Sequence, residues 1–217
     1  MYRKLILPAI FVMILMFVTN TITVTSVAEK GTIIDHDIEG NVTWTKEGSP
    51  YIITRTVAVR GILTVEPGVT ILWNYNVNLY VYGKVVIKGT SEEPVVLNTT
   101  EDAYRIWSPG FIISEGEVRI ENAVVSLVVL GIDNGKFVAK NIKGEGIAFM
   151  PSTNADIVIE NADLWQIYMP ESAGRMPVEV NGKSVFVGNP VVLKNSKLIL
   201  RNVFVKMSIG AIPYPLR

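Results

Sequence analysis

The stretch Asp156-Ile-Val-Ile-Glu-Asn-Ala-Asp163 decides the fold, because phrases like it recur along the second half of the chain. In each phrase apolar and polar residues alternate and run into an asparagine. The phrases are residues 117–124, 136–142, 156–163 and 197–204, and their asparagines are Asn122, Asn141, Asn161 and Asn202. Alternation predicts a β-strand, since successive strand side chains point to opposite faces. Spacings of 19, 20 and 41 residues between the asparagines predict a stack of coils, the last spacing being close to two periods.

The asparagine of each phrase is expected to stack on the next one. Equivalent residues of neighbouring parallel coils lie about 4.8 Å apart, so each amide can donate to the next. Asparagine also tolerates the left-handed backbone angles of a sharp turn. The preceding residues Glu121, Lys140 and Glu160 alternate in charge and predict an outward ladder, whereas Ile120, Ala139 and Ile159 are predicted to point inward.

Upstream of the repeats, short strands are predicted between Trp44 and Asn98, separated by turns such as Pro67-Gly68. Between Asn161 and Asn202 two readings stay open. Residues 178–187 supply a missing coil with Val180 or Asn181 at the stacking position, or residues 170–195 depart from the coil as a loop or hairpin. The second reading is favoured, because Asn181-Gly182 between alternating runs is a strong hairpin signal.

The N-terminus has the pattern of a secretory signal peptide. Arg3 and Lys4 precede an apolar run from Leu5 to Val18, and Ser26-Val27-Ala28 offers a cleavage site. We therefore expect residues 1–28 to be a signal peptide, with an uncleaved membrane anchor as the alternative, residues 29–43 to form a leader or N-terminal cap, and residues 44–217 to form one β-helix domain. Export would make the sequons at Asn41 and Asn98 candidate glycosylation sites, although both also suit plain turns.

The charge and cysteine content narrow the classes of partner. The 189 residues that remain after the signal carry 18 basic and 20 acidic side chains, so no electrostatic footprint for nucleic acid is present. The chain has no cysteine, so its stability must come from burial and backbone pairing.

Three stretches, after the opening Trp44 and residues 47–53, carry a family resemblance. They are residues 63–71, which contain Glu66-Pro67-Gly68-Val69, residues 79–84 with a Gly83-Lys84 turn, and residues 89–97. Together they resemble the first coils of secreted right-handed parallel β-helix proteins of bacterial and archaeal cell surfaces. The resemblance implies an all-β, right-handed, single-stranded parallel β-helix of about six to eight coils. This fold is shared with pectate lyases and polysaccharide hydrolases, so a carbohydrate context is only loosely implied, and the matched residues are structural rather than catalytic.

No catalytic set is predicted. Polysaccharide hydrolases need converging carboxylates, for which the candidates are Asp102, Asp133, Asp156 and Asp163. Asp133 and Asp156 lie about one coil apart, but both read as turn residues. The lone histidine in Asp35-His36-Asp37 reads as part of a solvated leader, so neither a metal site nor a cofactor is expected.

Exposed aromatic residues give the remaining functional signal. If Trp73, Leu79 and Val81 point inward, Tyr80 and Tyr82 point outward and could stack on sugar rings, with Trp107, Trp165 and Tyr168 as additional candidates. The main hypothesis is a non-catalytic extracellular or cell-surface structural or adhesion protein that self-associates or binds other surface components. The alternative is a carbohydrate-binding or polysaccharide-degrading protein.

Overall fold

The computed structural model describes residues 31–74, 76–100, 110–168, 175–180, 183–188 and 193–206. Residues 1–28, the expected signal peptide, lie outside these ranges. The described elements are one 3-10 turn, η1 (Lys46–Gly48), and 18 strands. The strands are β1 (Thr32–Ile34), β2 (Asn41–Trp44), β3 (Tyr51–Ile53), β4 (Val57–Val59), β5 (Ile62–Val65), β6 (Thr70–Trp73), β7 (Leu79–Val81), β8 (Lys84–Lys88), β9 (Val95–Thr99), β10 (Gly110–Ser114), β11 (Glu117–Asp133), β12 (Lys136–Phe149), β13 (Ser152–Thr153), β14 (Asp156–Tyr168), β15 (Arg175–Val180), β16 (Lys183–Gly188), β17 (Leu193–Lys194) and β18 (Lys197–Val205).

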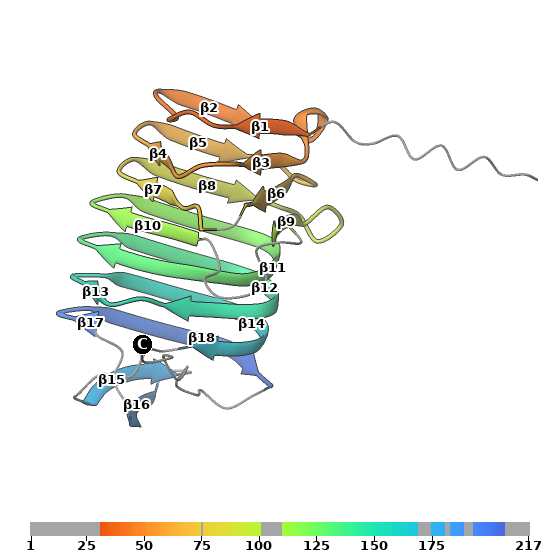
Figure 1. The fold of residues 1–217 in the computed structure, drawn as a ribbon. Coiled ribbons are helices and arrows are strands. Elements are labelled where there is room, and N and C mark those ends of the chain that lie inside the picture. The colour runs from red at the N-terminus through yellow and green to blue at the C-terminus, as the bar shows by residue number, and fades with distance from the viewer. Residues whose placement is uncertain are drawn as a thin grey trace, which may run out of the picture.

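The strands hydrogen-bond into one sheet that is almost entirely parallel. Each segment pairs with the segments one repeat before and after it, and Figure 1 shows the resulting levels stacked from β1 and β2 at one end to β17 and β18 at the other. Among the strands that the structure describes, only β15 and β16 pair antiparallel. The prediction of an all-β, parallel architecture is therefore confirmed, and the arrangement is compatible with a solenoid.

The pairings define three faces. Face A consists of residues 41–44, 62–65, 84–88, 117–121, 136–140, 156–160 and 197–201. Face B consists of residues 32–34, 51–53, 70–73, 95–99, 123–125, 142–144, 162–164 and 203–205. Face C consists of residues 57–59, 79–81, 110–114, 127–133, 146–149, 152–153, 166–168 and 193–194. The chain runs through A, B and C in turn, and β11 passes through all three.

The core lies between the faces, because alternate residues of each strand point inward. On face A one inward column is built of large apolar residues, namely Leu63, Val85, Val118, Phe137, Ile157 and Leu198. Trp73 and Phe111 meet edge to face with their ring centroids 5.8 Å apart. Burying one such side chain contributes roughly 1.5–3 kcal/mol, so repetition of the column stabilises a chain that has no disulfide.

The sheet begins earlier than the expected domain boundary at Trp44. β1 pairs with β3 and β2 pairs with β5, so the segment 29–43, expected as a leader or cap, already supplies the first level of strands from Thr32 onward. The outward Ile33 and the inward Ile34 show the same alternation as the later strands.

Within the stretch 170–195, the described residues 175–180 and 183–188 leave the regular pattern. β14 pairs directly with β18, with Glu160 opposite Arg201, so the reading that placed a regular coil between Asn161 and Asn202 is wrong. β15 and β16 form an antiparallel hairpin joined by residues 181–182, which lie outside the described ranges. The end of β15 also pairs with β18 on the edge opposite β14, and it thereby covers part of a strand edge that would otherwise be open.

No helix in the described ranges is long and apolar enough to span a membrane.

Candidate functional site

Asn122, Asn141, Asn161 and Asn202 are stacked at the corner between faces A and B. The Nδ2 of Asn141 donates to Oδ1 of Asn122 at 3.1 Å, and Asn161 donates to Asn141, and Asn202 to Asn161, at 3.0 Å each. Each has a positive φ of 51° to 53°. The amide of Asn122 donates to the carbonyl of Gly89 at 2.9 Å, so a backbone group ends the ladder. Asparagine suits this position for two reasons. Its backbone tolerates left-handed angles, and its side-chain amide can both donate and accept hydrogen bonds along the stack.

A second asparagine column, which the sequence interpretation missed, lies at the corner between faces C and A. Asn134, Asn154 and Asn195 have φ values of 51°, 49° and 51°, and Nδ2 of Asn154 donates to Oδ1 of Asn134 at 2.6 Å. Each lies seven residues before a member of the first ladder, and this constant offset was the available signal. Because the three residues sit outside the strand phrases, they read as ordinary turn asparagines.

Charged side chains form a column beside the first ladder on face A. Glu121, Lys140 and Glu160 are register partners, and the inward residues beside them are buried. The ammonium of Lys140 lies 3.0 Å from Glu160, whose other oxygen contacts Arg201 at 2.6 Å. Hydrogen bonds from Lys140 and Arg201 lower the pKa of Glu160, which favours its charged form.

A parallel charged column runs along the start of the same strands. Lys84 lies 3.0 Å from Glu117, and Arg119 contacts Glu117 at 2.5 Å. Partial burial of Glu117 opposes ionisation, but the hydrogen bonds from Lys84 and Arg119 outweigh it and the pKa of Glu117 is lowered. Lys136 and Asp156 continue this column at 3.5 Å. The carboxylate of Glu117 is therefore held ionised by Lys84 on the neighbouring strand and by Arg119 on its own strand.

The candidate catalytic carboxylates occupy different places in the fold. Asp133 ends the face C segment opposite Ser114 and Thr153, whereas Asp156 starts a face A segment opposite Lys136. Asp163 lies on face B and contacts Lys206 at 3.5 Å. Asp102 lies outside the described residues. Within the described ranges, no three His, Cys, Asp or Glu side chains are grouped so as to hold a metal ion.

The segment around His36 is exposed and engaged in local contacts. Nδ1 of His36 lies 3.1 Å from Asp35. Asp37 accepts hydrogen bonds from the backbone N–H of Ala58 and from Arg60, and these lower its pKa in that order of importance. Asp37 is therefore part of a structural cluster at the first levels of the stack, which also includes the contact of Arg60 with Glu39 at 2.8 Å.

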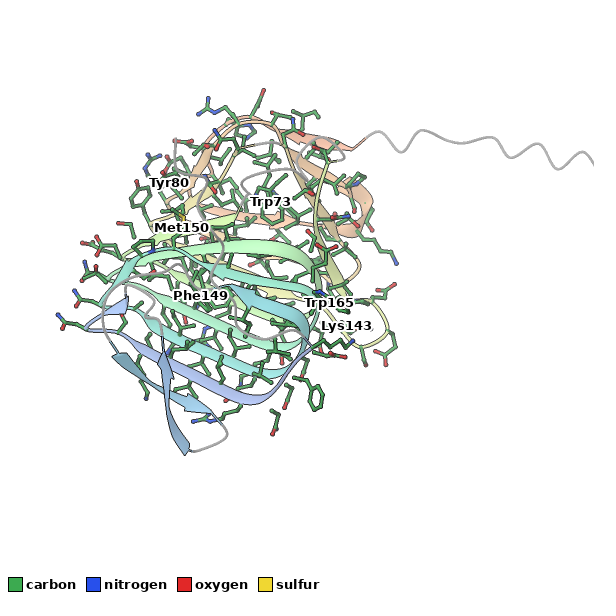
Figure 2. All side chains as sticks on the ribbon, turned by 60° about the horizontal axis from the view of Figure 1, so that its bottom comes forward. Trp73, Tyr80, Lys143, Phe149, Met150 and Trp165 are labelled. Atoms are coloured by element: carbon green, nitrogen blue, oxygen red, sulfur yellow. The ribbon has the colours of Figure 1, made fainter. Side chains whose placement is uncertain are left out.

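Tyr80 and Tyr82 both point outward, with 37% and 49% of their surfaces exposed, while Trp73, Leu79 and Val81 are buried. The guanidinium of Arg60 lies over the Tyr82 ring at 5.8 Å from its centroid, so part of that ring is already covered. Figure 2 shows Tyr80 on the same side as Met150, and Trp165 and Lys143 on the other side of the molecule. The aromatic residues considered from the sequence therefore do not form one strip; Trp107 and the side chain of Tyr168 lie outside what the structure describes.

A shallow groove follows the first asparagine ladder on its face B side. Its volume is about 440 Å³, and it is lined by Asn141, Asn161 and Asn202 on one side and by Lys143, Asp163 and Phe204 on the other. The last three residues are register partners on adjacent strands, so they form a row parallel to the ladder. Sequence reasoning missed this groove, because Phe204 comes beside Asp163 only through the direct pairing of β14 with β18.

Both sequon asparagines are exposed. Asn41 starts β2, and Asn98 lies in β9, where its Oδ1 accepts the backbone N–H of Thr99 at 2.8 Å.

Comparison of the chain with protein-family models, with curated proteins and with solved structures gives no match.

Proposed function

We propose that this protein is a non-catalytic extracellular or cell-surface component with a structural or adhesive role, built on a right-handed parallel β-helix of about six to eight coils. The observation that supports this proposal best is that the polar side chains bond to one another along the stack. In the described levels, side-chain amides and charged groups bond mainly to their counterparts on neighbouring strands. Such contacts between equivalent residues stabilise a rigid, repetitive scaffold. The N-terminal pattern of residues 1–28 supports export.

The polysaccharide-degrading alternative has weaker support. Such chemistry needs two carboxylates on either side of one glycosidic bond. Asp133 and Asp156 are on different faces, and Asp156 faces a lysine. An enzyme of this kind would release reducing sugars from soluble polysaccharides, and a hydrolysis screen with the full chain tests for that.

Two measurements test the proposed role. Cell fractionation of the producing cells should recover the protein from the cell surface or the medium, and sedimentation velocity of the purified chain should show species larger than a monomer. A strict monomer with no surface retention would contradict the proposal. A repetitive stack with an open end offers unpaired strand edges, which is the physical reason to expect association.

A further inference from the structure

Two exposed aromatic residues beside the groove have no role in the core. Phe204 is 74% exposed and Trp165 is 51% exposed. Asp163 lies on face B, and Trp165 follows directly after the end of this face at Leu164, at the corner toward face C. Figure 2 shows Trp165 and Lys143 on the same side of the molecule. Exposed aromatic rings flanking a concave row of polar groups are the usual elements of a ligand platform.

Two ladder amides in the groove, those of Asn141 and Asn161, retain hydrogen-bonding capacity. Asn141 donates one N–H to Asn122 and accepts one from Asn161, and Asn161 is bonded in the same way to its two neighbours. An amide has two N–H groups and two lone pairs, so each of these two side chains keeps one donor and one acceptor. Both asparagines are exposed and stand one strand spacing apart, about 4.8 Å. A ligand that donates and accepts at adjacent positions fits this array, and neighbouring hydroxyl groups do both.

The charges around the groove cancel. The two charged residues that line the groove, Lys143 and Asp163, have opposite signs, and Lys206 contacts Asp163 at 3.5 Å. A balanced site gives no general attraction for an acidic or basic ligand. The chemistry of the groove therefore favours a neutral ligand that combines apolar faces with many hydroxyl groups.

We propose that the groove bounded by the Asn141–Asn161–Asn202 ladder and by Phe204, with Trp165 beside it, binds a neutral oligosaccharide. The aromatic rings stack on the C–H faces of the sugar rings, and the amides of Asn141 and Asn161 bond to sugar hydroxyls. This site is separate from Tyr80 and Tyr82, and it adds a ligand to the proposed scaffold role without being required by that role.

Binding is measured with the full 217-residue chain in a detergent that has no sugar headgroup. A panel of neutral hexasaccharides, with cello-, xylo-, manno- and malto-oligomers and one acidic pectic oligomer, is titrated by calorimetry. We expect at least one neutral oligomer to bind. The Trp165→Ala and Phe204→Ala variants should each weaken its binding about tenfold, which corresponds to about 1.4 kcal/mol. The Tyr80→Ala variant removes a comparable exposed ring from face C and should bind as the unchanged protein does.

Three outcomes would overturn the proposal: no neutral oligomer binds, binding is unchanged in both groove variants, or only Tyr80→Ala loses binding. Preference for the acidic oligomer, abolished by salt, would also overturn it. Circular dichroism of each variant shows whether the fold is retained, and because both side chains are exposed we expect no loss of structure. Failure here leaves the scaffold proposal standing, since self-association and surface retention are measured independently of any sugar.

Discussion

Replacing Asn141 by leucine tests the asparagine ladder most directly. Asn141 has a φ of 53° and two ladder hydrogen bonds, of 3.1 and 3.0 Å. A left-handed backbone costs an ordinary L-residue about 1–2 kcal/mol. Each lost hydrogen bond contributes about 0.5 kcal/mol, the low end of the range, because the exposed partners regain water. We therefore expect Asn141→Leu to lower the free energy of unfolding by about 2–3 kcal/mol.

The neighbouring Lys140→Leu variant is the matched control. It places the same side chain one residue earlier, at an outward strand position. It removes the contact between Lys140 and Glu160, an exposed ion pair of the kind that contributes about 0.2–1 kcal/mol. Glu160 keeps its contact with Arg201. The loss for Lys140→Leu should therefore be well below that for Asn141→Leu.

A third variant, Asn141→Gly, separates the two causes. Glycine accepts the positive φ but cannot make the side-chain bonds, and its greater freedom when unfolded costs about 0.5–1 kcal/mol. Its loss should fall between those of the two leucine variants. Guanidinium denaturation followed by circular dichroism gives the three values. Equal losses for Asn141→Leu and Lys140→Leu would refute the role of the ladder, and a glycine variant as unstable as Asn141→Leu would refute the backbone part of the argument.

Three further predictions concern the corners and the charges. Asn154→Leu should cost about 2 kcal/mol in denaturant titrations, because its φ of 49° suits leucine poorly and a 2.6 Å amide bond is lost; no loss would show that the second column is incidental. Gly61→Ala should largely prevent folding, since the new Cβ would lie 1.7 Å from the carbonyl oxygen of Gly40, whereas Gly40→Ala meets open space and costs only about 1 kcal/mol for its φ of 68°. Thermal unfolding midpoints compare the two variants. A lower midpoint for Gly40→Ala than for Gly61→Ala would contradict this prediction. The lowered pKa values of Glu160 and Glu117 mean that their contribution is complete above the unfolded-state pKa of about 4.3 and is lost as the pH falls through their lower folded-state values. Denaturation midpoints should therefore fall in acid, and less steeply in the double Glu-to-Gln variant; parallel curves for the two proteins would contradict this.

The parallel sheet was predictable because its signals lie inside strands. Alternation, a residue repeated at a fixed offset and alternating charge beside it all describe the same register, and each follows from the period of two of a strand. The observed partners of Glu121, Lys140 and Glu160 follow that register. Agreement between independent local signals is what makes a sequence specify one arrangement.

The groove was less predictable because it depends on an excursion of the chain. Phe204 comes beside Asp163 only if the 40 residues between Asn161 and Asn202 close into one level, with the hairpin on the edge of β18 that faces away from β14. Sequence periodicity alone allows two levels there equally well. Whether this stretch forms one level or two depends on the antiparallel pairing of β15 with β16. That pairing joins two neighbouring strands, so it leaves no periodic signal in the sequence.

The corner before face A is built in two ways along the stack. In the first levels this corner is held by glycine, and a Cβ at Gly61 or Gly83 would lie 1.7 or 2.1 Å from the backbone of the preceding level. From Glu115 onward the preceding residue has a positive φ, as do Asn134 and Asn154. Where two stacked levels share that conformation, the corner no longer brings a Cβ against the backbone of the preceding level. A Cβ at Gly135 would meet mainly side-chain methyl groups, and Ala155 already has a Cβ at the equivalent position. In both corner types the carbonyl before face A accepts an N–H of the next level: Gly61 from Lys84 at 2.9 Å and Gly116 from Lys136 at 3.0 Å. The stack therefore changes corner type once, near residue 115: in the first levels glycine alone holds the corner, and from Glu115 onward a residue with a positive φ precedes it.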